Sequence, residues 1–184
     1  MRRVAAVLVH YPVLDREGSI VTSAITNLDL HDIARSAHTY GLSDFFVVHP
    51  VAAQRTLAER VCEHWTRGSG GRRIPDRTPA MQIIRVVPTL DDALAALGEG
   101  VELWTTSARA AGPLLGFADA RERLAAAGPA VALAFGTGWG LAEQVYARAS
   151  ARLEPIQSPR ADGYNHLSVR AAAAISFDRL LTPR

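Results

Sequence analysis

Three glycines and a threonine separate an apolar run from a helix-like stretch in AFGTGWGLAEQV, residues 134–145. Gly136, Gly138 and Gly140 have no Cβ, so the chain can turn sharply there and a ligand can approach the bare backbone. Such a turn is typical of loops that hold a nucleotide or a cofactor. It also suits a tight strand-to-helix connection without a ligand, so its role depends on the rest of the chain.

A second group of chemically capable residues lies nearer the N-terminus and consists of Asn27, Asp29, His31, Asp32 and Arg35. On a helix, His31 and Arg35 are four residues apart and share a face, while Asp29 lies at the helix start. A carboxylate or an imidazole can accept a proton, and an arginine can stabilise a developing anion. The alternative interpretation is an N-cap aspartate followed by a solvated polar face.

A long polar loop with two prolines, LEPIQSPRADGYNHLS (153–168), leads into a final helix that we predict over 165–181. The exposed backbone donors of a first helical turn favour an anion or a polar ligand edge. The alternative is an N-cap after a long connection. The residues expected in that first turn are Asn165, His166, Leu167 and Ser168.

The segment TRGSGGRRIPDRTP (66–79) is rich in glycine, proline and arginine, and an insertion of this kind is often functional. We predict a mobile basic loop whose candidate RNA-binding residues are Arg67, Arg72, Arg73 and Arg77. Trp65, just before it, either stacks on a base or anchors the loop. All 20 basic residues of the chain are arginines, whose planar donors match phosphate. The absence of lysine excludes a Schiff base, a lysine general base and a Walker A loop.

The elements that must position these groups alternate along the chain. Partly β-branched apolar runs predict strands at 4–10, 44–50, 82–88, 101–107 and 130–136. Helical patterns occupy 29–41, 51–65, 89–98, 117–128, 140–150 and 165–181. This alternation predicts an α/β fold with a mainly parallel sheet, and strands with few polar interruptions fit helices on both faces. Ligands of such sheets bind beyond the carboxyl ends of the strands, where we expect 104–109, 136–141 and 153–168.

With 184 residues and a net charge of +2, the chain is expected to form a single domain over 1–184. The first apolar stretch is interrupted at His10, which favours a buried strand over a signal peptide. No apolar run approaches the ~20 residues of a membrane span, so we expect a cytoplasmic protein. His10 and His49 end predicted strands and are expected to make structural contacts. Cys62 is the one cysteine and no histidine pair has metal-ligand spacing, so we expect no disulfide and no metal.

Three stretches in order, LWTTSAR (103–109), LAFGTGWGL (133–141) and LEPI…YNHLSVRAAAAI (153–175), resemble the three motifs of the SPOUT superfamily of RNA methyltransferases. The chain is most similar to a small bacterial family of stand-alone SPOUT domains, some related to the tRNA guanine-N1 methyltransferases. That family also shows the early LVHYPV…GSIVTSAITNLDLHDIARSAHTYG. The resemblance covers essentially the whole chain. It implies a deep C-terminal trefoil knot, a homodimer with active sites at the subunit interface, and S-adenosyl-L-methionine (AdoMet) as cofactor.

The resemblance also assigns residues. AdoMet would be held by the three motifs, through Leu103, Thr105, Thr106, Gly136, Thr137, Gly138, Gly140, Ile156, Tyr164, Asn165 and Leu167. DIARSAHTYGL resembles the first motif of SPOUT ribose 2′-O-methyltransferases, in which an arginine near the target is proposed to help deprotonate the hydroxyl. Arg35 matches that arginine. The familiar asparagine six residues earlier is replaced by Asp29, with Asn27 two residues further back, which departs from the ribose pattern.

The sequence therefore predicts an AdoMet-dependent RNA methyltransferase that acts on tRNA or other structured RNA, at a ribose 2′-hydroxyl or a guanine base. Either acceptor holds its proton at neutral pH and needs a base or a stabilising cation. The catalytic candidates are Arg35, Asp29 and His31, with Arg160 and Asp162 as alternatives from the other side of the site. His166 either titrates near neutral pH or orders its loop, and Arg170 either reaches a phosphate or closes the dimer interface.

Two alternatives compete with this interpretation. A non-catalytic AdoMet- and RNA-binding module would keep the fold without the chemistry. A Rossmann-like dehydrogenase would need G-x-G-x-x-G after the first strand, whereas here G-x-G-x-G follows a late strand.

Overall fold

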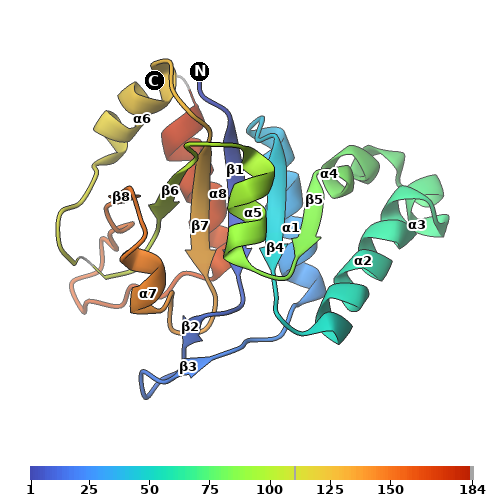
Figure 1. Cartoon of the computed structure of the whole chain (residues 1–184), viewed down its shortest axis with the longest axis horizontal. Coiled ribbons are helices and arrows are strands. Elements are labelled where there is room, and N and C mark those ends of the chain that lie inside the picture. The colour runs from blue at the N-terminus through green and yellow to red at the C-terminus, as the bar shows by residue number, and fades with distance from the viewer. Residues whose placement is uncertain (110, 183–184) are drawn as a thin grey trace.

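Six parallel strands form the central sheet of the computed structural model, which describes residues 1–109 and 111–182 (Figure 1). Their order is β5-β4-β1-β7-β6-β8, and every neighbouring pair is parallel. The strands are β1 (Val4–Val9), β4 (Asp44–Val48), β5 (Ile84–Val87), β6 (Glu102–Thr105), β7 (Val131–Gly136) and β8 (Ala151–Arg152). The predicted α/β fold with a mainly parallel sheet is confirmed.

Helices cover both faces of this sheet because successive side chains of a strand point in opposite directions. Ala6 and Leu8 of β1 belong to one core, shared with α1 (Asn27–Thr39), α6 (Phe117–Ala125) and α8 (Val169–Leu181). Ala5 and Val7 belong to the opposite core, shared with α5 (Leu90–Leu97) and α7 (Glu143–Tyr146). Figure 1 shows α5 in front of the strands, with α1 and α8 behind them.

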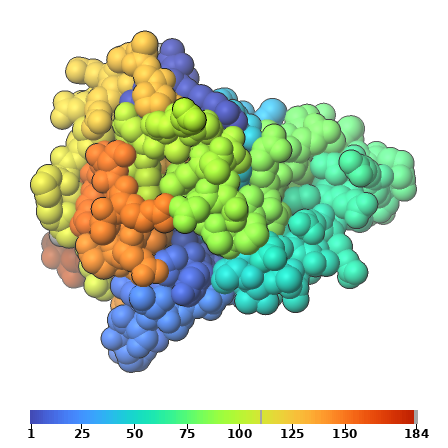
Figure 2. Space-filling model, in the orientation of Figure 1, coloured from blue at the N-terminus to red at the C-terminus, as the bar shows by residue number. Residues whose placement is uncertain are grey.

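The basic segment 66–79 is ordered, so the prediction of a mobile loop is wrong. After α2 (Ala52–Thr66) it forms α3 (Ser69–Arg73), the 3₁₀ helix η1 (Pro75–Arg77) and the start of α4 (Thr78–Gln82). Trp65 holds these turns together: the Arg77 guanidinium lies 4.4 Å from its ring centroid, and Thr78 Oγ1 donates to its carbonyl at 2.9 Å. We call residues 52–82 the arm, because they protrude to one side of the molecule (Figure 2).

Among the other element boundaries that differ from the predictions, three have a clear local cause. The expected strand at 82–88 starts late because Gln82 ends α4. The expected helix at 140–150 shrinks to α7, because Gly140 and Ala142 bond instead to the N-terminal segment, through Leu14 N–H to Gly140 O at 2.9 Å and Ala142 N–H to Pro12 O at 3.2 Å. The final helix starts at Val169, because Ser168 is its N-cap, so residues 165–168 precede the first turn.

Two short strands, β2 (Val13–Leu14) and β3 (Ile20–Val21), form an antiparallel hairpin after β1 that the sequence patterns did not predict. They lie beyond the carboxyl ends of the sheet strands (Figure 1). None of the helices in residues 1–109 and 111–182 is both long enough and apolar enough to cross a membrane.

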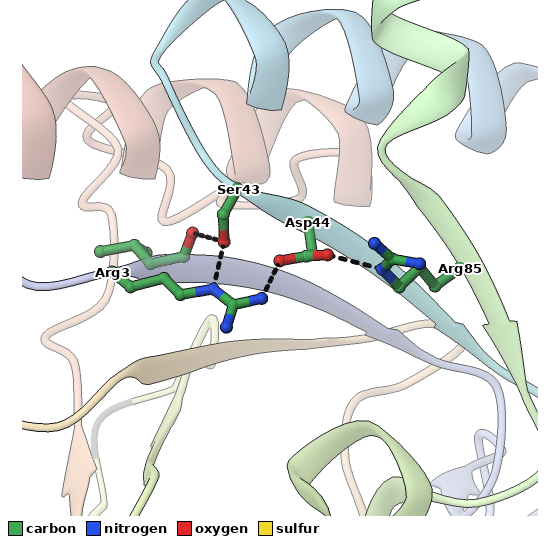
Figure 3. A network of polar contacts seen from close by, with 5 residues as sticks. Arg3, Ser43, Asp44 and Arg85 are labelled. Atoms are coloured by element: carbon green, nitrogen blue, oxygen red, sulfur yellow. Dashed lines mark hydrogen bonds and ion pairs between the residues drawn. The ribbon is translucent and has the colours of Figure 1, made fainter. Parts of the chain in front are cut away.

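A buried carboxylate joins the opposite, amino ends of three strands (Figure 3). Asp44 accepts hydrogen bonds from Arg3 Nη2 at 2.5 Å and from Arg85 Nε at 2.6 Å, and Arg3 Nε also donates to Ser43 Oγ at 2.9 Å. Burial alone would raise the pKa of Asp44, but the hydrogen bonds from Arg85 and Arg3 outweigh it and hold the pKa below its usual value. This cluster therefore favours the folded state at neutral pH.

Candidate functional site

A cavity of about 710 Å³ opens beyond the carboxyl ends of β6 and β7, the edge at which ligands of parallel sheets bind. Four stretches far apart in the sequence form its walls: residues 23–29, 106–109, 135–140 and 153–170, with further residues of α6 and α8. A cavity of this size accommodates a nucleoside-sized ligand.

The glycine turn after β7, residues 136–140, forms one wall of the cavity. Gly138 and Gly140 have φ values of +59° and +112°, a backbone conformation that glycine adopts without strain. A Cβ on Gly136 would lie 2.6 Å from the backbone nitrogen of Leu141, so the turn closes too tightly there for a side chain. The turn is bound to the N-terminal segment through Trp139 N–H, which donates to Leu14 O at 2.9 Å.

The loop 153–168 forms the opposite wall, and side-chain bonds fix its shape. Asn165 Nδ2 donates to Ile156 O at 2.8 Å, which closes the loop across nine residues. Glu154 Oε1 accepts from the Phe117 backbone N–H at 2.9 Å and so binds the loop to the start of α6. Apolar side chains line the same region, namely Phe117, Phe135, Leu153, Ile156 and Leu167. The cavity thus combines an apolar surface with a few fixed polar groups.

An ion pair between α1 and α8 lies in the cavity wall. Arg170 Nη1 is 2.8 Å from Asp29 Oδ1, and both residues line the cavity. The Asp29 side chain is 8% exposed and that of Arg170 is 32% exposed. Arg170 Nε also lies 3.4 Å from Asp32 Oδ2. The site therefore pairs a nearly buried carboxylate with a guanidinium that solvent or a ligand can reach.

The structure brings eight of the eleven predicted cofactor residues to this cavity: Thr106, Gly136, Thr137, Gly138, Gly140, Ile156, Asn165 and Leu167. Three do not line it. Leu103 and Thr105 are buried within β6, with Leu103 in the core shared with α5 and α7, and Tyr164 is 64% exposed.

Of the three predicted catalytic residues, Asp29 lines the cavity and the other two do not. His31 packs edge-on against the Trp65 ring, with centroids 5.1 Å apart. Burial lowers the pKa of His31, and the nearby Arg77 lowers it further. Arg35 is exposed on α1. The structure thus joins Asp29 with Arg170, for which the sequence predicted a phosphate or dimer contact, rather than with His31 and Arg35.

Of the remaining candidates in the long loop, one lines the cavity and two do not. His166 lines the cavity, whereas Arg160 and Asp162 are exposed and pair with each other, at 2.9 Å between Arg160 Nε and Asp162 Oδ1. The hydrogen bond from Arg160 lowers the pKa of Asp162. Sequence reasoning missed Ser23 and Glu154 as cavity residues, since no motif that it used gives either of them a role.

The predicted RNA-binding arginines all lie on the arm. Arg67, Arg72 and Arg73 are exposed, whereas Arg77 is half-buried over Trp65. Within the described part of the chain, no three His, Cys, Asp or Glu side chains are arranged to hold a metal ion.

Comparison with known proteins gives matches along nearly the whole chain. The model of a family described as SAM-dependent RNA methyltransferase matches residues 3–182. The chain is 42% identical over 184 residues to a tRNA (guanine-N(1)-)-methyltransferase of Oleidesulfovibrio alaskensis, a match that covers 98% of this chain but 42% of that protein. The chain therefore spans less than half the length of this relative. An uncharacterized protein of Aquifex aeolicus is 34% identical over 179 residues, with 95% of this chain and 86% of that one covered.

Solved structures share the fold at low sequence identity. A putative methylase family protein from Neisseria gonorrhoeae has a TM-score of 0.66 at 20% identity, covering 98% of this chain and 82% of that one. TrmJ from Z. mobilis has a TM-score of 0.61 at 19% identity, with coverages of 98% and 68%. An AdoMet-bound rRNA methyltransferase from Sinorhizobium meliloti has a TM-score of 0.59 at 19% identity, with coverages of 97% and 55%.

Proposed function

This chain belongs to the SAM-dependent RNA methyltransferase family, which confirms the resemblance of its three motifs, and from that membership we propose its activity. It transfers the methyl group of AdoMet to a structured RNA such as tRNA, at a ribose 2′-hydroxyl or a guanine base. The observation that carries the proposal is one cavity that joins the glycine turn of residues 136–140 to the Asp29–Arg170 ion pair.

The residues at the cavity fit AdoMet. The glycine turn offers bare backbone to a ligand, and the apolar wall of Phe135, Ile156 and Leu167 suits an adenine ring. We assign cofactor binding to the eight predicted residues that line the cavity, with Leu103, Thr105 and Tyr164 supporting them from β6 and the long loop. When bound, AdoMet supplies an electrophilic methyl group, and the chain must align the acceptor and remove its proton.

We assign proton removal to Asp29 and stabilisation of the resulting anion to Arg170. Asp29 Oδ1 is engaged by Arg170, which orients the carboxylate toward the cavity that both residues line. The positive charge of Arg170 lies beside the same carboxylate, where it favours an anionic acceptor oxygen or nitrogen. Arg35 is exposed one helical turn beyond Asp32 and is assigned to an RNA phosphate, while His31 supports the arm through Trp65.

The RNA surface that we propose is the arm together with the cavity mouth. Arg67, Arg72 and Arg73 contact phosphates, and Arg77 holds the arm in shape from within.

The SPOUT resemblance further supports a deep C-terminal trefoil knot and a homodimer with the cavity at its interface. Large apolar side chains that are exposed on the glycine turn and on the long loop support the dimer, because a partner subunit would cover them. They are Trp139 (51% exposed), Tyr164 (64%) and Leu167 (42%). A single domain over residues 1–184 and a cytoplasmic location stay predictions.

The test is mass spectrometry of nucleosides from unmodified bulk tRNA, after incubation with the purified protein and isotope-labelled AdoMet. We expect one labelled nucleoside with the wild-type chain and none with Asp29→Asn. A labelled 2′-O-methylnucleoside identifies the ribose as acceptor, and labelled 1-methylguanosine identifies the base. AdoMet binding by calorimetry without any label would favour the non-catalytic module, and failure to bind AdoMet would refute the proposal.

A further inference from the structure

A buried polar cluster adjoins the cavity at the carboxyl end of β1 and shares only Thr137 with the groups assigned above. His10, fully buried, directs Nδ1 at Ser23 Oγ, 2.9 Å away. The Ser23 hydroxyl bonds to the hydroxyl of Thr137, which in turn lies 3.3 Å from Val9 O. Ser23 and Thr137 line the cavity, and His10 does not. A chain of hydrogen bonds thus leads from a buried imidazole to the glycine turn.

The donor and acceptor of each hydrogen bond in this series follow from its last acceptor, the carbonyl oxygen of Val9. Thr137 Oγ1 donates to the Val9 carbonyl, so it accepts the proton of Ser23 Oγ. Ser23 Oγ therefore accepts from His10, which carries its proton on Nδ1. Burial lowers the pKa of His10 to about 4, helped by His49 and opposed by Asp29 and Ser23. The ring is therefore neutral at neutral pH, and its one N–H is committed to Ser23.

A second imidazole fixes the backbone of the same serine. His49 Nδ1 accepts from Val51 N–H at 3.1 Å, so His49 Nε2 carries the proton and donates to Ser23 O at 2.9 Å. Ser23 N–H donates to His10 O at 3.0 Å. Ser23 is thereby held through its side chain and both of its backbone polar groups.

Packing alone does not explain a histidine at this buried position. His10 Nε2 is buried and has no hydrogen-bond partner among the described residues, so an apolar side chain would fill the position at a lower desolvation cost. A buried polar network whose other members are bonded does, however, select one arrangement of the groups that it joins. Here it fixes the side chain of Thr137, which lies between Gly136 and Gly138, two residues with no side chain that could hold the turn in place.

We propose that His10 is a positioning residue of the cofactor cavity, which fixes Thr137 through Ser23 and so holds the glycine turn in shape before a ligand binds. The inference rests on the proposed function for the identity of that ligand. The rigidity of the glycine turn, however, can be measured without the ligand.

The test is hydrogen exchange of the turn amides in His10→Leu and His10→Asn. Leucine fills the volume without a donor, whereas the asparagine side-chain nitrogen occupies the place of Nδ1 and can donate to Ser23. We expect exchange of the Thr137, Trp139 and Gly140 amides, bonded to Val9 O, Leu14 O and Thr137 O, to rise about tenfold in His10→Leu. His10→Asn should restore nearly wild-type exchange, and AdoMet affinity measured by calorimetry should follow the same order.

Ser23→Ala breaks the same series of hydrogen bonds and leaves His10 in place. It therefore tests the inference even if His10→Leu fails to fold. It should raise exchange as His10→Leu does, and the double variant should be no worse than either single one. Equal exchange in His10→Asn and His10→Leu, wild-type exchange in Ser23→Ala, or additive effects of the two changes would overturn the inference. A wild-type chain that binds no AdoMet would refute the proposed function instead, and the exchange data would still decide the role of His10.

Discussion

Removal of the Arg170 guanidinium should leave the Asp29 carboxylate unpaired in the cavity wall. Breaking a buried ion pair on one side typically costs about 3–5 kcal/mol. The Asp29 side chain is 8% exposed, but that of Arg170 is 32% exposed, so water already screens part of the pair. We therefore expect Arg170→Ala to lower the free energy of unfolding by about 2 kcal/mol. For a chain of this size, that corresponds to a fall in Tm of roughly 4–8 °C.

The double variant Asp29→Asn/Arg170→Met separates stability from chemistry. With both charges removed, no unpaired ion is left in the wall, so urea denaturation should return most of the lost free energy of unfolding. Methyl transfer should stay at least about 100-fold below wild type, because the carboxylate to which we assign proton removal is absent. The matched control is Asp32→Asn, which removes the more distant partner of Arg170, at 3.4 Å, and should change stability by less than about 0.5 kcal/mol and leave turnover intact.

Two results would refute this reasoning. Wild-type stability of Arg170→Ala would show that the pair contributes nothing to the wall. Turnover in Asp29→Asn/Arg170→Met comparable to that of Asp32→Asn would show that proton removal occurs elsewhere.

Other perturbations test the fold, the arm and the turn. Asp44→Asn should lower the free energy of unfolding at pH 7 by about 2 kcal/mol. Because the folded pKa of Asp44 is lowered, its contribution is fully present above the unfolded pKa. Urea titrations should show the difference shrink as the pH falls below about 4 and vanish once the pH has passed through the lowered folded pKa. Arg72→Ala/Arg73→Ala should weaken tRNA binding in filter assays and reduce its salt slope by about 1.5 to 2, with AdoMet affinity unchanged; equal loss of both affinities would contradict this. Gly136→Ala places a Cβ 2.6 Å from Leu141 N, so calorimetry should show AdoMet affinity reduced at least about tenfold.

The motifs predicted which segments meet at the cavity better than which side chains face it. All three stretches, 103–109, 133–141 and 153–175, contribute residues to its walls. Within the first stretch, Thr106 lines the cavity but Thr105 and Leu103 do not, because both still belong to β6 and are buried there. A motif identifies the segment of the sequence that reaches the site. The residue at which β6 ends depends on its pairing with β7 and β8.

Helical periodicity predicted which residues of α1 share a face, but it could not predict which other elements each face contacts. His31 and Arg35 were predicted to share a face. Asp29 is two residues from His31, about 200° around the helix, and so faces elsewhere. Its partner Arg170 is 141 residues away in the sequence, in an unrelated helix. Such a contact follows from the packing of α1 against α8, for which a local pattern has no signal.

The order of the arm changes how the chain is expected to meet RNA. Composition alone indicated a mobile segment, since 66–79 combines glycine, proline and arginine. In the fold, Trp65 is half-buried and contacts Arg77, His31 and His64, which supports its prediction as an anchor of the arm. Arginines on an ordered arm lose less conformational entropy on binding than those on a flexible loop. Because His31 belongs to the same helix as Asp29, α1 places the arm at a fixed distance from the cavity. Under the proposed function, α1 therefore sets the distance between the arm, which would hold RNA phosphates, and the Asp29 carboxylate.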